Sequence, residues 1–194
     1  MISRIDQMIL ELKDTTDLMV DLAYSSLLYN NVEIAEEVVM LSEKMSDLVD
    51  STQDQLVEVG KASPDEVYRA IVTTRLMDSM LDIADAAESI ADTVIRGLAD
   101  HPVLAMSIRE SETTICLAKV AEDSVLAGKT FGELSLSTNS SMFVIAIRRD
   151  DGYIFGPDHK VRIEAGDILM AKGPQDAEGY FKDLADGTEK TIGE

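Results

Sequence analysis

The pattern of apolar residues changes abruptly near residue 106, and this change decides what the chain can fold into. Before it, apolar residues recur at helical spacing through long segments with few turn signals. After it, short β-rich runs alternate with Gly, Asn and Asp turns, and a short helical segment closes the chain. Because a period of 3.6 residues indicates helices and a period of 2 indicates strands, the sequence predicts two domains with separate cores.

The first half predicts three long helices. The first spans about residues 3–29. Asn30 is expected to cap the second helix, with Glu33 three residues later, because an Asn cap followed by Glu is a helix-start signal. The second helix then runs to about residue 60, and the third spans about 64–98. Three helices of this length predict an antiparallel bundle.

The third helix is apolar over two lines rather than one. Such a helix must be covered on most sides. Two neighbours in the same chain do not suffice for this, so we expect a homodimer or a docking partner. The two lines are Met77, Leu81, Ala84, Ala91 and Ile95, and Met80, Ile83, Ala87, Ile90 and Val94.

Four carboxylates in the predicted helices have the spacing of a metal site. Glu43 and Asp47 lie one turn apart on the second helix, as do Glu88 and Asp92 on the third. Glu88 also falls within an apolar line, where a carboxylate is costly unless it is paired or binds a metal. Two such pairs on packed helices could hold a divalent or trivalent cation through oxygen ligands. Ordinary solvated helix faces remain the alternative.

The helical half resembles the PhoU family, whose three-helix units carry E/D-x-x-x-D motifs that bind metal clusters. The resemblance covers roughly residues 1–100 and gives one three-helix unit instead of the usual two. It rests on the order and length of the helices and on the two carboxylate pairs. It implies a regulatory adaptor that binds metal through Glu43, Asp47, Glu88 and Asp92.

The net charge of −20 limits the kinds of molecule that this chain can bind. Residues 1–106 carry 21 acidic and 7 basic side chains, so this half holds −14 of the excess. Such a field repels nucleic acid and anionic lipid surfaces, so no nucleic-acid partner is expected. Solubility or adaptation to a salty cytoplasm explains the charge equally well. The single cysteine, Cys116, and the absence of a secretory or membrane-spanning apolar run predict a cytoplasmic protein.

The second half predicts a small α+β domain. Its turn signals include Asp150-Asp151-Gly152, which is typical of a hairpin. The expected elements are a strand over 113–120, a short helix over 131–134, a strand over 142–148, a strand over 168–172 and a final helix over 175–184.

These residues resemble the TrkA-C domain, also called the C-terminal RCK domain, over about 107–187. The matching stretches are Gly128-Lys129-Thr130, Val144-Ile145-Ala146-Ile147-Arg148-Arg149, Gly156-Pro157 and Ala165-Gly166-Asp167-Ile168-Leu169. The resemblance implies a domain that pairs with itself and binds small regulatory ligands near the dimer interface. It also implies control of cation transport, chiefly of potassium. Nucleotides such as cyclic di-AMP bind some members.

The resemblance also implies a set of ligand contacts. Arg148 and Arg149 are adjacent on a predicted strand and face opposite ways, so one is expected to bind an anion and the other to form a surface ion pair. His159 could bond a base or a phosphate, or simply be an exposed turn residue. The expected ligand residues are Val144, Ala146, Ile147, Arg148, Pro157 and His159.

Neither nucleotide-fold motifs nor catalytic motifs occur. The chain has no G-x-G-x-x-G sequence and no P-loop, so NAD is not expected as a cofactor. It has no Ser-His-Asp or Cys-His arrangement, and two histidines in separate domains make a poor acid–base system, so an enzyme is not expected.

Together these observations predict a PhoU-like domain over 1–100, a connector over 101–110, a TrkA-C domain over 111–187 and a tail over 188–194. The expected function is a regulatory subunit, peripheral to the membrane, of a cation transporter or channel, with potassium as the expected cation. It would sense a small anionic ligand through the TrkA-C dimer and relay the signal through the helices. The alternative is a PhoU-like metal-binding adaptor that regulates phosphate uptake.

Overall fold

The computed structural model describes residues 4–60, 64–98 and 113–193. The chain divides into two compact units, Met1–Ala105 and Met106–Glu194. The first unit is helical and the second combines a four-stranded sheet with short helices. The predicted fold class, a helical bundle followed by a small α+β domain, is confirmed. The predicted connector over 101–110 lies outside the described residues.

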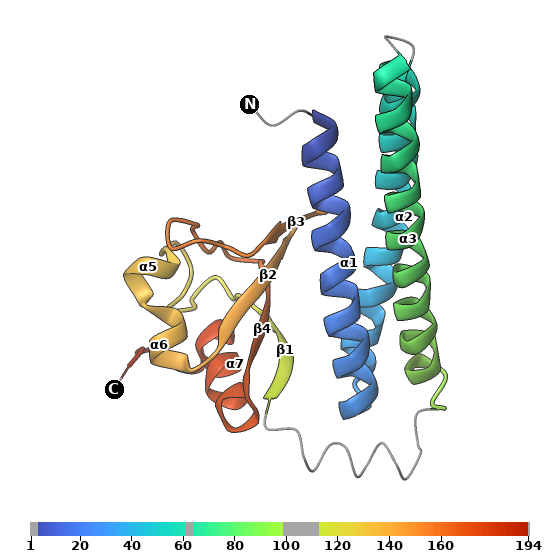
Figure 1. Ribbon diagram of the computed structural model, residues 1–194. Coiled ribbons are helices and arrows are strands. Elements are labelled where there is room, and N and C mark those ends of the chain that lie inside the picture. Colours follow the sequence, from blue (N-terminus) through green and yellow to red (C-terminus); the bar gives the residue numbers. More distant parts are fainter. Residues whose placement is uncertain (1–3, 61–63, 99–112, 194) are drawn as a thin grey trace. The chain divides into compact units, whose positions relative to one another are not determined.

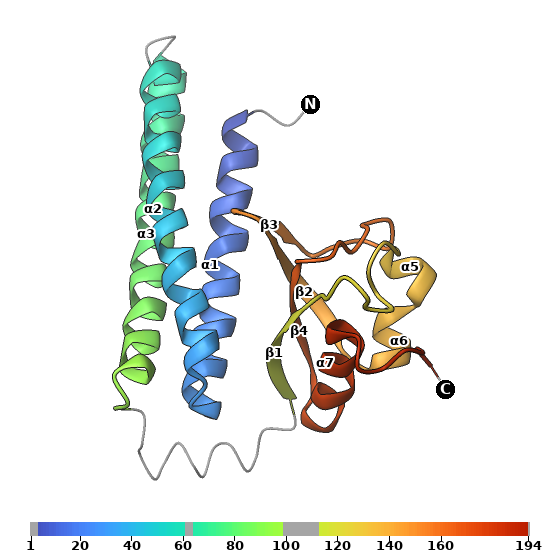
Figure 2. The ribbon, with the colours of Figure 1, turned by 180° about the vertical axis from the view of Figure 1, so that it is seen from behind.

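Three long helices form the first unit (Figures 1 and 2). They contain no Gly or Pro except at their ends, because Pro64 begins the third helix and Gly60 ends the second. Pro is tolerated in the first turn of a helix, and a terminal Gly allows the chain to leave it. The helices are α1 (Arg4–Tyr29), α2 (Val32–Gly60) and α3 (Pro64–Ile95).

Asn31, rather than Asn30, caps α2, which corrects the sequence prediction. The Oδ1 atom of Asn31 accepts a hydrogen bond of 3.2 Å from the backbone N–H of Ile34. Asn30 has a φ of +48° instead. This left-handed conformation ends α1, and Asn tolerates it better than most residues do. Asn30 therefore ends α1, and Asn31 caps the start of α2.

Helix α3 ends at Ile95, about one turn before the predicted end. Gly97 has a φ of +68°, and its N–H donates to the carbonyl of Val94 at 2.9 Å. The N–H of Leu98 donates to the carbonyl of Thr93, also at 2.9 Å. Glycine adopts this conformation without strain. The two hydrogen bonds satisfy carbonyl groups at the end of the helix that would otherwise have no donor.

The core of the bundle is built from Leu, Ile, Met and Ala, as the apolar spacing predicts. Both lines of α3 are buried only in part, since Ile95 of the first is 39% exposed and Ile83 of the second is 48% exposed. Fully buried large side chains of this unit are Leu12, Met19, Leu22, Ile34, Leu41, Met45 and Met77.

The second unit is an antiparallel sheet with the strand order β1-β4-β2-β3. All of its helices lie on one face of this sheet (Figure 2). The elements are β1 (Thr113–Lys119), α5 (Phe131–Leu134), α6 (Leu136–Ser140), β2 (Phe143–Arg149), β3 (Gly152–Phe155), β4 (Ile168–Pro174), a 3₁₀ turn (Gln175–Ala177) and α7 (Glu178–Asp186).

Strand β2 contains an irregularity that changes which residues reach the core. Its register against β4 shifts between Val144 and Ala146. Side chains of a strand normally alternate between the two faces of the sheet, and one extra residue reverses this alternation in the part of the strand that follows. Val144 and Ile147, which are three positions apart, therefore both belong to the core that the helices cover. The sequence alone gives no sign of this bulge.

The last residues are packed rather than forming a loose tail. Ile192 packs against the core of the second unit. The Nζ atom of Lys190 lies 2.7 Å from Oδ2 of Asp123, and the N–H of Gly193 donates to the hydroxyl of Tyr180 at 3.2 Å. In the described part of the chain, no helix combines the length and apolar character needed to cross a bilayer.

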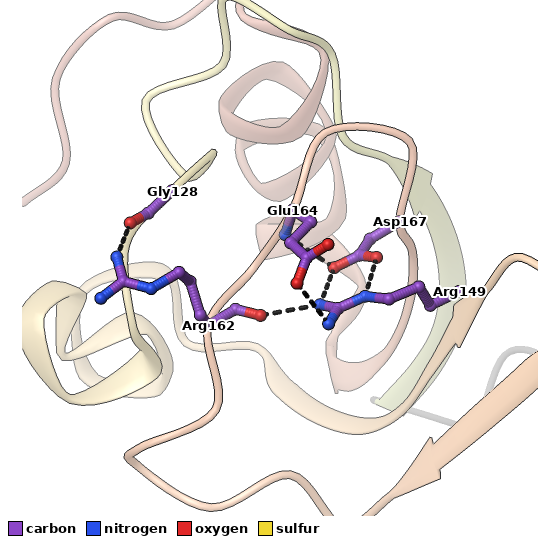
Figure 3. A network of polar contacts seen from close by, with 5 residues as sticks. All are labelled: Gly128, Arg149, Arg162, Glu164 and Asp167. Carbon is purple, nitrogen blue, oxygen red and sulfur yellow. Dashed lines mark hydrogen bonds and ion pairs between the residues drawn. The ribbon is translucent and has the colours of Figure 1, made fainter.

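Arg149 and a buried carboxylate fix the segment that leads into β4 (Figure 3). Both oxygens of Asp167 accept bonds of 2.8 Å from Arg149, and Asp167 is only 1% exposed. Arg149 also donates to Glu164 at 2.6 Å and to the carbonyl of Arg162 at 2.7 Å. The hydrogen bonds to Asp167 raise the pKa of Arg149, so the guanidinium stays charged.

Arg149→Gln should destabilise the second unit by roughly 3–5 kcal/mol, because it leaves the buried carboxylate of Asp167 without its cation. Chemical denaturation of the full chain, followed by a probe in the second unit, measures this loss. Glu164→Gln removes only an exposed partner of the same arginine and should cost about 1 kcal/mol or less. Equal effects of the two substitutions would contradict the role given to Asp167.

Candidate functional site

A surface hollow on the second unit gathers residues from three separate segments. Its volume is about 290 Å³. Helices α5 and α6 line one side, the beginning of β2 lines another, and the turn after β3 closes it. The lining residues are Phe131, Gly132, Ser135, Leu136, Ser137, Thr138, Met142, Phe143, Val144, Pro157 and His159.

Three of the six predicted ligand residues line this hollow. Val144 enters it from β2, while Pro157 and His159 come from the turn after β3. Ala146 and Ile147 are not among the lining residues, and both are 0% exposed. The β2 bulge explains Ile147, which faces the helix-covered core.

Of the two adjacent arginines, Arg149 forms the ion pairs described above. Arg148 is half-buried, opposite Tyr153 of β3 and Ile168 of β4, and it does not line the hollow. Contact between Arg148 and a ligand therefore remains a prediction.

Sequence reasoning missed most of the other lining residues. Phe143 is 59% exposed at the start of β2, and Phe131 is half-buried in α5. The hydroxyls of Ser135, Ser137 and Thr138 come from α6 and the residue before it. The run Leu-Ser-Thr-Asn-Ser has the composition of a loop, so α6 was not predicted. An exposed Phe beside a buried strand was the available signal.

A capping box holds α5 against the hollow. The N–H of Thr130 donates to Oε2 of Glu133 at 2.7 Å, and the N–H of Glu133 donates to Oγ1 of Thr130 at 3.2 Å. The bonds from the backbone and the hydroxyl of Thr130 lower the pKa of the Glu133 carboxyl. The carboxylate is therefore favoured in the folded chain.

Gly132 joins α5 to the turn that carries His159. Its N–H donates to the carbonyl of His159 at 2.9 Å. A Cβ atom at this position would lie 2.9 Å from the same carbonyl oxygen, so only glycine permits the approach. The carboxylate of Asp158 accepts from the N–H of Lys160 at 2.7 Å, which tightens the turn further.

The four carboxylates of the predicted metal site are not gathered into one group. Glu43 and Asp47 are exposed on α2. Glu88 instead accepts a hydrogen bond of 2.5 Å from the hydroxyl of Ser42, and Asp92 pairs with Arg96 at 2.7 Å. Within the ranges that the structure describes, no three His, Cys, Asp or Glu side chains come together to hold a metal ion.

The Ser42 hydroxyl explains how Glu88 is tolerated in an apolar line. The bond joins α2 to α3 and satisfies one oxygen of a half-buried carboxylate. A hydroxyl partner therefore takes the place that the sequence analysis gave to a metal ion.

The chemistry of the hollow is that of binding. Its aromatic and aliphatic side chains suit a planar apolar group, and its hydroxyls and imidazole suit the polar edge of a ligand. His159 is the only titratable side chain among the lining residues.

Comparison with protein families assigns both halves of the chain. The model of the TrkA-C domain matches residues 117–186, and the model of the PhoU domain matches residues 9–94. These families are regulatory rather than catalytic. A search of curated proteins found no significant match.

Solved structures similar to parts of the chain include RCK C-terminal domains. The RCK_C domain dimer of S. agalactiae BusR in complex with c-di-AMP is 25% identical, and the match covers 39% of this chain and 97% of that chain, with a TM-score of 0.35. The RCK C domain of the potassium transport protein KtrA in complex with the same ligand is 27% identical, with coverages of 42% and 93% and a TM-score of 0.35. S. agalactiae BusR in complex with its busAB-promotor DNA is 17% identical, with coverages of 84% and 97% and a TM-score of 0.36.

Gly132→Ala should destabilise the second unit by about 1–3 kcal/mol, because the new methyl group meets the carbonyl of His159 and overpacks the contact. Thermal denaturation measures the effect. Gly179→Ala is the matched control, since this helical glycine has nothing within 4 Å of an added Cβ. The control should be neutral or stabilising by up to about 1 kcal/mol. A stabilised Gly132→Ala variant would argue against the close approach.

The capping box should lose its effect in acid. The pKa of Glu133 is lowered from 4.5, so its stabilising contribution is complete above about pH 4.5 and is lost as the pH falls through the lower, folded-state pKa. Glu133→Gln should therefore lower the thermal midpoint at pH 6 and change it much less at pH 3. Glu122→Gln, at an exposed turn position, serves as the control. An effect of Glu133→Gln that is the same at both pH values would contradict this assignment.

Proposed function

We propose that this chain, which joins a PhoU domain to a TrkA-C domain, is a regulatory subunit of a cation-transport system, with potassium as the expected cation. A homodimer of the TrkA-C domain would bind a small anionic ligand of the nucleotide type. The PhoU helices would carry the resulting change to a membrane transporter or channel subunit. The observation that carries the proposal is the hollow of the TrkA-C domain, which is lined by Val144, Pro157 and His159.

The lining of the hollow suits a nucleobase. Phe143 presents an exposed ring on which a planar base can stack. The hydroxyls of Ser135, Ser137 and Thr138 can bond the sugar or phosphate, and His159 adds a further polar contact. These groups come from elements that the capping box and Gly132 hold together, so the site is largely formed before a ligand arrives.

The size of the hollow favours a ligand shared by two copies. Its volume of about 290 Å³ lies at the lower end of the range of roughly 300–1,000 Å³ that is usual for small-molecule sites. A dinucleotide bound there would extend beyond one hollow. A second TrkA-C domain could cover the rest, which agrees with the pairing expected for this domain.

The alternative function, a metal-binding adaptor for phosphate uptake, has less support. It depends on carboxylates that the described residues do not gather into one group. Two of them have other partners, since Glu88 bonds Ser42 and Asp92 pairs with Arg96.

Calorimetric titration of the full chain with cyclic di-AMP, ATP, ADP and AMP tests the proposal. We expect heat with at least one of them and a ratio near one dinucleotide for two chains. His159→Ala should weaken binding about tenfold, because a hydrogen bond to a charged group contributes about 1.5–3 kcal/mol. Phe143→Ala should have a similar effect through lost stacking, worth about 1–3 kcal/mol per base.

Lys160→Ala is the control for these substitutions. Lys160 is exposed next to His159 but does not line the hollow, so its loss should change affinity less than threefold, in line with an exposed charge. Absence of heat with every nucleotide would leave the TrkA-C domain as a pairing module and would overturn the sensor function.

A further inference from the structure

Helix α3 carries a line of exposed apolar side chains on a face that the bundle does not cover. Val72, Leu76 and Ile83 are 50%, 48% and 48% exposed. Tyr68 continues the line toward the beginning of the helix. The buried face of α3 is a different one, represented by Met77 and Ala84. The exposed line is therefore not part of the core of its own unit.

The spacing of this line is that of a helix–helix seam. Its members recur at alternating intervals of four and three residues over almost three heptads. Side chains with this spacing form one continuous stripe along the helix, which a second helix can contact over its whole length. Randomly placed exposed side chains would form no such stripe. We define the α3 seam as Val72, Leu76, Ser79, Ile83, Ala86 and Ile90.

We propose that the α3 seam packs against the α3 seam of a second copy of this chain, with the two helices antiparallel. The helices then meet around a twofold axis that lies between residues 77 and 78. Leu76 packs opposite the partner's Ser79, and Val72 packs opposite the partner's Ile83. Leu76 therefore meets a small side chain near the centre of the contact, which lets the two helices approach closely.

Charge complementarity points to a second copy and to the antiparallel orientation. Arg75 and Asp82 are both exposed, and each directly precedes a large seam residue. In the antiparallel arrangement, Arg75 and the partner's Asp82 are offset by only about 3 Å along the helix axis. The twofold symmetry forms the same pair a second time. A parallel arrangement would place Arg75 and the partner's Asp82 on opposite sides of the contact, so this pair would not form.

This interface is separate from pairing of the TrkA-C domains and does not require a ligand. It uses the PhoU helices alone, so a chain that pairs at both places would be held at two points. The seam also accounts for Val72, Leu76 and Ile83, which the two neighbouring helices leave exposed.

Site-specific cross-linking of the full chain tests both the contact and its direction. The background is Cys116→Ala, which removes the one native cysteine. In the proposed pair, two Ser79→Cys sulfurs are about 10 Å apart, because the helices lie about 8–10 Å apart and the two positions differ by about 4.5 Å along the axis. Two Ala86→Cys positions are separated by about 25 Å along the axis.

A short bis-maleimide should therefore link Ser79→Cys chains at least tenfold more efficiently than Ala86→Cys chains. Equal linking at both positions would show parallel helices and overturn the proposal. No linking at Ser79→Cys would overturn it as well, since another molecule or solvent would then cover the seam.

Substitutions in the seam provide a second, independent measurement. Leu76→Asp in the Ser79→Cys background should reduce cross-linking at least tenfold. Ile71→Asp is the matched control, because Ile71 is 50% exposed on the same helix but lies off the seam. Unchanged linking in Leu76→Asp, or an equal loss in both variants, would overturn the proposal.

Charge reversal decides the orientation even if Leu76→Asp fails to fold. Arg75→Asp and Asp82→Arg should each reduce cross-linking at Ser79→Cys, because each places like charges across the interface. The double variant should restore it, because the opposite-charge pair forms again in reverse. Failure of the double variant to recover would overturn the antiparallel pairing.

Discussion

The ion pair of Arg149 with the buried carboxylate of Asp167 holds a region of the TrkA-C domain that strand pairing does not. Between β3 and β4 the chain makes a single isolated bridge to another segment within the described residues, from Arg162 to Thr130. Backbone hydrogen bonds also hold this segment, such as those from Gly128 to the carbonyl of Ile163 at 2.8 Å and from Gly132 to the carbonyl of His159 at 2.9 Å, and side chains add to them. Arg149 binds Asp167, Glu164 and the carbonyl of Arg162, while Arg162 donates to the carbonyl of Gly128. The turn that supplies Pro157 and His159 begins this segment, so the ligand hollow depends on it.

The fold could be predicted from the sequence, but only part of the candidate ligand site could. Long helices with periodic apolar residues and strands bounded by Gly and Asp were predictable, because local patterns determine them. Asp167 lies in a stretch that was recognised as a family match, but its burial beneath Arg149 is a tertiary contact between residues 18 positions apart. The β2 bulge also depends on strand pairing that no local pattern specifies. The cap at Asn31 is local, but two consecutive asparagines left the choice between them open to the wrong assignment.

The same reasoning explains the metal prediction. One-turn spacing correctly placed Glu88 and Asp92 on one helix, but it could not show that Ser42 of α2 reaches Glu88. The pair of Asp92 with Arg96 is different, because its spacing of four residues is visible in the sequence. A costly buried carboxylate requires a partner, and a hydroxyl satisfies that requirement as a cation does. Spacing along one helix indicates which face a side chain shares, whereas the identity of its partner is decided by the neighbouring helix.

The absence of Gly and Pro from the interiors of α1, α2 and α3 makes each of them a stiff rod. Helices bend sharply at such residues or where their hydrogen bonds are interrupted. The 32 residues of α3 extend about 48 Å, so tilting it by about 5° at one end would move the other end by about 4 Å. A stiff α3 would therefore turn a small rotation at one end into a displacement as large as a side chain at the other.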